Sequence, residues 1–236
     1  MRNSLIRQWK GWLMILMAAG LATATLAGCK PREILPTQVG QVIYSGQEAV
    51  QYRSIELPNQ LRVMLISDSR LDRSAASLSV GVGSLGDPAE RSGLAHFLEH
   101  MLFLGTEKFP DVSSYSQFMT ANAGYSNAYT ADNHTNYYFE VTHEAFPEAL
   151  DRFSQFFIAP LFDPHYTARE LNAVDSEHAK NRENDFWRVR QVQRSHYRKD
   201  HPANRFSTGN KSTLQGTSQE ELLRFYRQHY SANRMT

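Results

Sequence analysis

The amino-acid sequence predicts an α+β fold: a mostly antiparallel sheet with helices packed on one face. Strand-like segments come early in the chain and helix-like segments late, and tight turns join the strands where crossover helices would stand in an α/β fold. The composition is that of a globular domain, with 41% hydrophobic and 21% charged residues among 236. The formal net charge of +1 gives no reason to expect a nucleic acid partner.

Residues 1–28 are predicted to be a signal peptide and not part of this fold. Three basic residues precede an uncharged, apolar run at 12–27, which is the order of the n-region and h-region of an export signal. The run is shorter than the roughly 20 residues that a membrane-spanning helix needs. The segment therefore predicts export of the mature chain.

The apolar run closes with Leu26-Ala27-Gly28-Cys29, which resembles a bacterial lipobox. Cys29 is the only cysteine of the sequence, so an internal disulfide is excluded. We expect cleavage before Cys29, acylation of that cysteine and attachment to a lipid bilayer. The alternatives are an uncleaved anchor and a signal without lipid. By the same resemblance, Lys30 favours the outer membrane, with the protein facing the periplasm.

Residues 29–50 contain prolines and little periodicity, which indicates a tether. Residues 51–236 are predicted to be the folded domain. Five of its segments have the composition and alternation of strands: 52–57, 61–66, 75–82, 125–130 and 134–141. The turn signal Pro58-Asn59 makes the first two of them a hairpin.

Helices are expected at 93–103, 113–123, 143–158, 166–197 and 218–230. The fourth is the longest, because no proline or glycine interrupts it. Ser218 and Glu221 fit a capping box at the start of the last. Residues 231–236 resemble a chain that enters a new strand, so the domain is expected to stop before its last strand.

The helix at 93–103 carries His96-x-x-Glu99-His100. The two histidines lie one helical turn apart on the same face, so both can reach one divalent metal, and Glu99 borders that face. This order of residues is an inverted zinc-protease motif. The competing interpretation is a pair of surface histidines on an amphipathic helix. The helix is apolar nearly all round and should be buried, and a buried cluster of this kind needs a metal or comparable compensation.

A catalytic zinc site takes three protein ligands and leaves one position open. The predicted helix at 166–197 is the best source of the third ligand. By spacing alone, Glu170, Glu177 and His178 are equal candidates, and Asp175 competes with them.

Five blocks of the sequence resemble the insulysin–pitrilysin group of inverted-motif zinc peptidases, in the order in which that group has them. The blocks are Gly83-Ser84-Leu85-x-Asp87-Pro88, Gly93-Leu94-x-His96-Phe97-x-Glu99-His100-Met101, Ser126-Asn127-Ala128-Tyr129-Thr130, His134-Thr135-Asn136-Tyr137-Tyr138-Phe139 and Asn172-Ala173-Val174-Asp175-Ser176-Glu177. Together they cover nearly the whole of residues 52–236.

This resemblance implies one zinc ion per domain, held by His96, His100 and Glu177, with Glu170 as a supporting acid. Glu99 would act as the general base on a zinc-bound water in the hydrolysis of extended peptides. The block that contains Asn127 and Ala128 resembles the group's edge strand, which pairs with the peptide main chain. Without the resemblance, it would be an ordinary hairpin strand.

The resemblance also implies that this chain is the first of four repeats in a clamshell enzyme. The arginine and tyrosine that contact the substrate carbonyl in that group belong to its C-terminal half, and no residue here corresponds to them. We therefore expect the domain alone to bind zinc but to cleave poorly without the missing half or a partner subunit.

Three other functions compete with a zinc endopeptidase. A non-catalytic structural or chaperone-like member of the same family would typically have lost the four residues of the site. S-ribosylhomocysteine lyase has the same motif but needs a site cysteine, and Cys29 lies in the lipobox. A lipid-anchored binding protein with an incidental histidine pair is the third.

Overall fold

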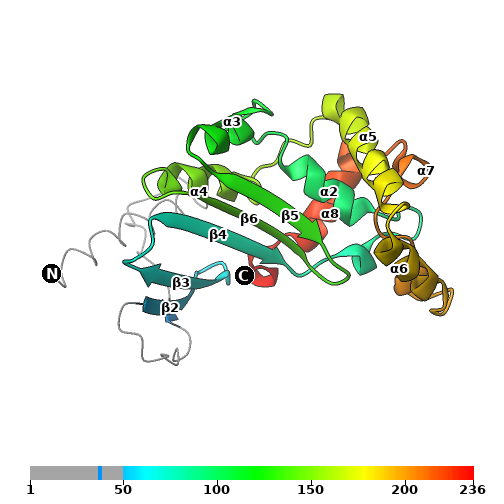
Figure 1. Cartoon of the computed structure of the whole chain (residues 1–236), viewed down its shortest axis with the longest axis horizontal. Coiled ribbons are helices and arrows are strands. Elements are labelled where there is room, and N and C mark those ends of the chain that lie inside the picture. The colour runs from blue at the N-terminus through cyan, green and yellow to red at the C-terminus, as the bar shows by residue number, and fades with distance from the viewer. Residues whose placement is uncertain (1–36, 39–49) are drawn as a thin grey trace, which may run out of the picture.

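The computed structural model describes residues 37–38 and 50–236 (Figure 1). The strands are β1 (Thr37–Gln38), β2 (Val50–Glu56), β3 (Arg62–Asp68), β4 (Arg73–Val80), β5 (Tyr125–Thr130) and β6 (Thr135–Thr142). The α-helices are α2 (Leu94–Leu102), α3 (Ser114–Ala121), α4 (Phe146–Gln155), α5 (Pro164–Asn181), α6 (Asp185–Ser195), α7 (Lys211–Leu214) and α8 (Gln219–His229). Short 3-10 turns are η2 (Ser84–Gly86), η3 (Pro202–Asn204) and η4 (Ala232–Arg234).

The predicted signal peptide, Cys29 and most of the predicted tether lie outside the described residues. Within the tether, β1 pairs with β2, so residues 37–38 lie against the domain. Among the described residues, no helix is both long enough and apolar enough to cross a bilayer.

The strands form two antiparallel sheets, ordered β1-β2-β3 and β4-β6-β5. The predicted α+β class is confirmed, but the strands divide between two sheets. In Figure 1 the β2–β3 hairpin lies apart from the β4-β6-β5 sheet, and the helices gather around the latter.

One face of the β4-β6-β5 sheet packs against helices, as predicted. Along β6, Tyr137, Phe139 and Val141 are buried while their neighbours are more exposed, which is the alternation of a sheet covered on one side. Helices α2 and α4 contact this sheet, and α8 contacts α2. The opposite face is open and carries Tyr125 and Tyr129.

The prediction of a single helix at 166–197 is wrong. Residues 182–184 are not helical, and they separate α5 from α6. The Asn184 side chain accepts a hydrogen bond from the Phe186 amide and starts a new helix. An asparagine can therefore end one helix and cap the next without proline or glycine. The helix expected at 143–158 is also shorter, since α4 spans Phe146–Gln155.

Residues at the end of the described chain form a bridge with β4. Met235 lies opposite Val80, and the amides and carbonyls of Ser79 and Thr236 exchange hydrogen bonds of 2.8 and 3.0 Å. The capping box of Ser218 and Glu221 at the start of α8 is confirmed.

Candidate metal centre

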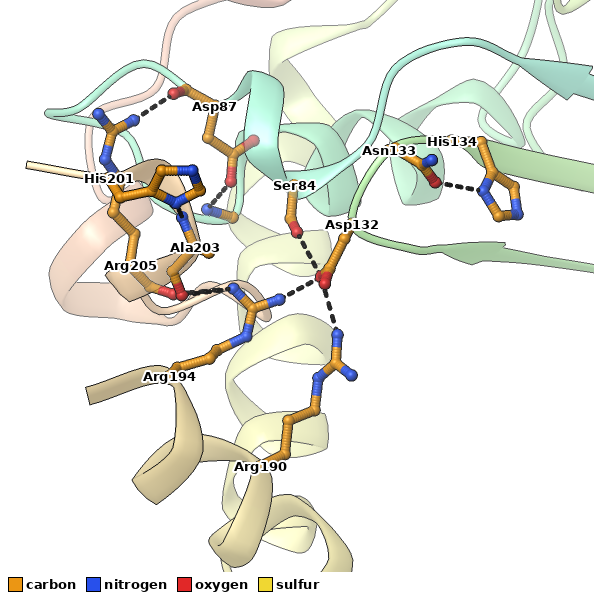
Figure 2. Close-up of polar contacts among 11 residues, drawn as sticks. Ser84, Asp87, Asp132, Asn133, His134, Arg190, Arg194, His201, Ala203 and Arg205 are labelled. Carbon is orange, nitrogen blue, oxygen red and sulfur yellow. Dashed lines mark hydrogen bonds and ion pairs between the residues drawn. The ribbon is translucent and has the colours of Figure 1, made fainter. Parts of the chain in front are cut away.

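Helix α2 is the most buried helix of the domain and carries the histidine pair. Its apolar side chains are buried, and Glu99 is only 6% exposed. The Asp87 carboxylate accepts hydrogen bonds from the amides of Gly93 (2.7 Å) and Ala95 (2.8 Å), which otherwise lack partners at a helix N-terminus. Arg205 in turn donates to the Asp87 backbone carbonyl (Figure 2). The start of α2 is thus fixed by polar contacts and its body by apolar packing.

The ring of His96 is held in one orientation by the segment before α7. Its Nδ1 lies 2.7 Å from the Thr208 carbonyl oxygen, which can only accept, so Nδ1 carries a proton and Nε2 is the ring atom left to bind a metal ion. Gly93 and Gly209 permit this approach, because a Cβ on Gly93 would lie 2.3 Å from the Gly209 Cα. Both have positive φ, +92° and +81°, where glycine is favoured.

Three side chains from α2 and α5 bring atoms that can ligate a metal close to one another. Glu177 Oε2 lies 3.4 Å from His96 Nε2 and 3.7 Å from His100 Nε2, and all three ligand atoms lie within 4.8 Å of one another. Tetrahedral zinc with bonds of about 2.0–2.1 Å separates its ligand atoms by about 3.3 Å. His96, His100 and Glu177 therefore could hold a metal ion.

The other candidates for the third ligand have different partners. Glu170 Oε2 lies 3.5 Å from His100 Nδ1, on the far side of that ring from Glu177, where it can orient the histidine. Asp175 accepts a hydrogen bond from the Lys211 amide of α7. The ring of His178 packs against Phe206 with centroids 4.7 Å apart. The tertiary structure therefore distinguishes the candidate third ligands, which their spacing in the sequence did not.

The charges of the site favour a cation. Burial alone would lower the pKa of His100, but hydrogen bonds to Glu170 and Glu177 outweigh it and raise the pKa to about 9. Hydrogen bonds from His100 and His96 hold the pKa of Glu177 well below its usual range. The carboxylates that stabilise protons on these rings would equally stabilise a metal ion, which would displace the protons.

Glu99 is not among these three side chains, and its carboxylate accepts a hydrogen bond from the sheet. The Thr130 hydroxyl, at the end of β5, donates a hydrogen bond to Glu99 Oε2. Burial raises the pKa of Glu99 above its ordinary value. A buried carboxylate beside the ligands, and outside their set, is suited to accept a proton.

Strand β5 has β6 as its one strand neighbour among the described residues, so its other edge is unpaired. Asn127 is exposed, and its side-chain oxygen accepts a hydrogen bond from the Ala128 amide at 2.9 Å. Its side-chain amide donates to the Tyr125 hydroxyl. Asn127 and Ala128 thus lie on an edge strand, where the resemblance places them.

A polar cluster ties the end of β5 to α6 and to the loop before α2. Arg190 and Arg194 of α6 both donate to Asp132 in the β5–β6 turn, and the Ser84 hydroxyl lies 3.4 Å from the same carboxylate (Figure 2). The Leu85 amide also donates to the Asp132 carbonyl. This cluster joins three segments that are far apart in the sequence.

Sequence reasoning gave no role to Asp87, Thr130 or Thr208. Asp87 had a usable signal, since an acidic residue before a helix is a capping candidate. Thr208 orients His96 through its backbone carbonyl, so the identity of its side chain could not indicate this contact. Thr130 lies 31 positions from Glu99, and only the fold brings the two together.

Comparison with known proteins places this geometry in a family. Residues 62–200 match the family model described as "Insulinase (Peptidase family M16)". The chain belongs to the insulinase family, M16. It is 50% identical to human insulin-degrading enzyme over 198 residues, which are 81% of this chain and 19% of that protein. It is 50% identical to the A-factor-processing enzyme of Saccharomyces cerevisiae over 191 residues, 78% of this chain and 19% of that protein.

The fold of this M16 chain is similar to a solved structure of pitrilysin. The TM-score is 0.82 at 38% identity, over 85% of this chain and 22% of that one. The chain thus spans about a fifth of the length of the relatives that it matches.

Proposed function

We propose that this chain is the zinc-binding N-terminal domain of an endopeptidase that hydrolyses extended peptides. The observation that carries the proposal is the convergence of His96, His100 and Glu177 beside a buried Glu99 that takes no part in the ligand set. Membership of M16 and similarity to a named insulin-degrading enzyme support a peptidase.

Zinc bound there would polarise the substrate carbonyl and make water acidic enough to attack it near neutral pH. Glu99 takes the proton of the attacking water and returns it to the leaving amine. Glu170 orients His100 through Nδ1, as the Thr208 carbonyl orients His96. Each of these roles belongs to a side chain whose place is fixed before substrate arrives.

The peptide binds along the free edge of β5. An extended peptide added to an edge strand gains main-chain hydrogen bonds irrespective of its sequence, so Asn127 and Ala128 would contribute affinity more than selectivity. Residues that contact the substrate carbonyl come from outside this chain, from a further part of the polypeptide or from a partner subunit. Residues 29–236 alone therefore bind zinc and turn over peptides poorly.

The test is metal content together with cleavage of a mixed peptide pool by the full-length gene product. We expect one zinc per domain, and a loss of about 10²- to 10⁴-fold in kcat for Glu99→Gln, with zinc retained. Glu183→Gln is a matched control, since Glu183 lies exposed in the break between α5 and α6. Wild-type cleavage by Glu99→Gln would remove the general-base role. A chain without zinc or activity would favour the non-catalytic alternative.

We also propose that Cys29 is acylated and anchors the protein to the outer membrane, facing the periplasm. The lipobox and Lys30 support this. Cells fed a labelled fatty acid should label the wild-type protein and not Cys29→Ser, and the label should fractionate with outer membranes. Unlabelled wild-type protein would contradict the anchor.

A further inference from the structure

We infer that Thr130 is a positioning residue for Glu99, and that it couples the peptide-binding edge strand to the group that moves the proton. This deepens the proposed function and depends on it. The inference is based on the hydrogen bond that the Thr130 hydroxyl donates to Glu99 Oε2. This bond joins the last residue of β5 to the middle of α2.

The bond has a geometric consequence for the carboxylate. Glu99 is buried, and a glutamate has three rotatable side-chain bonds, so packing alone leaves its terminal oxygens free to rotate. A donor on Oε2 fixes that rotation and leaves Oε1 free to face a water. A misplacement of about 1 Å at a reacting group can cost about 100-fold in rate, so a single hydroxyl can matter.

Thr130 can couple peptide binding to Glu99 because it belongs to the edge strand β5. Asn127 and Ala128 lie three and two residues before it on the same strand, so a peptide that pairs with β5 acts on the strand that holds Glu99. The β5–β6 turn that follows Thr130 is fixed by Arg190 and Arg194 through Asp132. The strand is therefore held just beyond the residue that contacts the base.

The fold offers a matched control directly across the sheet. Thr135 of β6 is the register partner of Thr130 in the antiparallel pair. Its hydroxyl donates to the Val82 carbonyl at 2.8 Å and does not bond to Glu99. Thr130→Val and Thr135→Val each remove one hydroxyl from adjacent strand positions with almost no change in shape.

The experiment uses the full-length gene product and a peptide substrate. Thr130→Val should lower kcat about 10- to 100-fold with KM within about threefold and zinc content unchanged. Thr130→Ser keeps the hydroxyl. If Thr130→Val lowers kcat about 100-fold, the kcat of Thr130→Ser should be at least about tenfold higher than that of Thr130→Val. Thr135→Val should lower the thermal midpoint and leave kcat within about twofold.

A second readout does not depend on turnover. A crystal structure of Thr130→Val should show the Glu99 carboxylate in a different rotamer or in several, while Thr130→Ser and Thr135→Val keep the wild-type rotamer. Glu99→Gln separates the two proposals. If Glu99→Gln is inactive while Thr130→Val matches wild type in kcat and rotamer, only the positioning role fails. If Glu99→Gln is fully active, the proposed function fails first.

Discussion

The two halves of the metal centre are built in different ways. Helix α2, which brings His96 and His100, is enclosed by apolar side chains and capped by Asp87. Helix α5, which brings Glu170 and Glu177, has Val174 as its one fully buried residue, and the Glu177 side chain is 38% exposed. The histidines are placed by packing, whereas the glutamates are placed largely by the charges that they meet. The contrast predicts different sensitivity to the core, to the metal and to pH.

The largest effect on stability should come from a substitution in α2 that leaves a cavity in the core. Leu98 is fully buried, so Leu98→Ala should lower the free energy of unfolding by about 2–5 kcal/mol. Val189 on α6 is 56% exposed, and Val189→Ala should change that free energy by no more than about 0.5 kcal/mol. Denaturant unfolding of both variants measures the difference. Similar losses for the two would contradict a stabilising core concentrated around α2.

An intermediate effect should follow removal of the metal. A chelator should increase amide hydrogen exchange in α5 by on the order of tenfold, because Glu177 would lose the proposed metal ion that links it to α2. Exchange in α2 should stay within about twofold. Glu177→Gln should show the faster α5 exchange before any chelator is added. An equal increase in both helices would contradict the comparison.

A third effect concerns pH and the cap of α2. Burial raises the pKa of Asp87 to about 7, against the opposing effect of the Ala95 and Gly93 amides. The folded chain then holds a proton that the unfolded chain releases near pH 4. The free energy of unfolding should therefore fall by about 1 kcal/mol per pH unit as pH rises from about 4 to about 7.

Asp87→Asn isolates this contribution, since asparagine does not titrate. The difference between the wild-type and Asp87→Asn profiles should vary across that pH window and be flat above it. Parallel profiles would show that Asp87 keeps an ordinary pKa, so that its carboxylate caps α2 in charged form throughout.

Local patterns in the sequence were sufficient for most of the elements. The hairpin turn, the strand alternation, the capping box of α8 and the apolar helix with its histidines depend on residues a few positions apart. The error at residues 166–197 has a local cause as well, because Asn184 can cap a helix but its composition signal is weaker than that of proline or glycine. The division of the strands into two sheets depends on pairing over long distances and had no local signal.

The sequence by itself determined the histidine pair, the glutamate between them and the burial of their helix, because helical periodicity fixes which side chains share a face. Tertiary structure decided the rest of the centre. It placed Glu177, and not Asp175 or His178, against both histidines through the packing of α5 on α2, a relation that spacing within one helix cannot specify. It also brought the Thr208 carbonyl to His96 and the Thr130 hydroxyl to Glu99, across 112 and 31 positions. Contacts of that kind arise from packing of the whole domain, and that packing brings a third candidate ligand and a hydrogen-bonded carboxylate to a two-histidine motif.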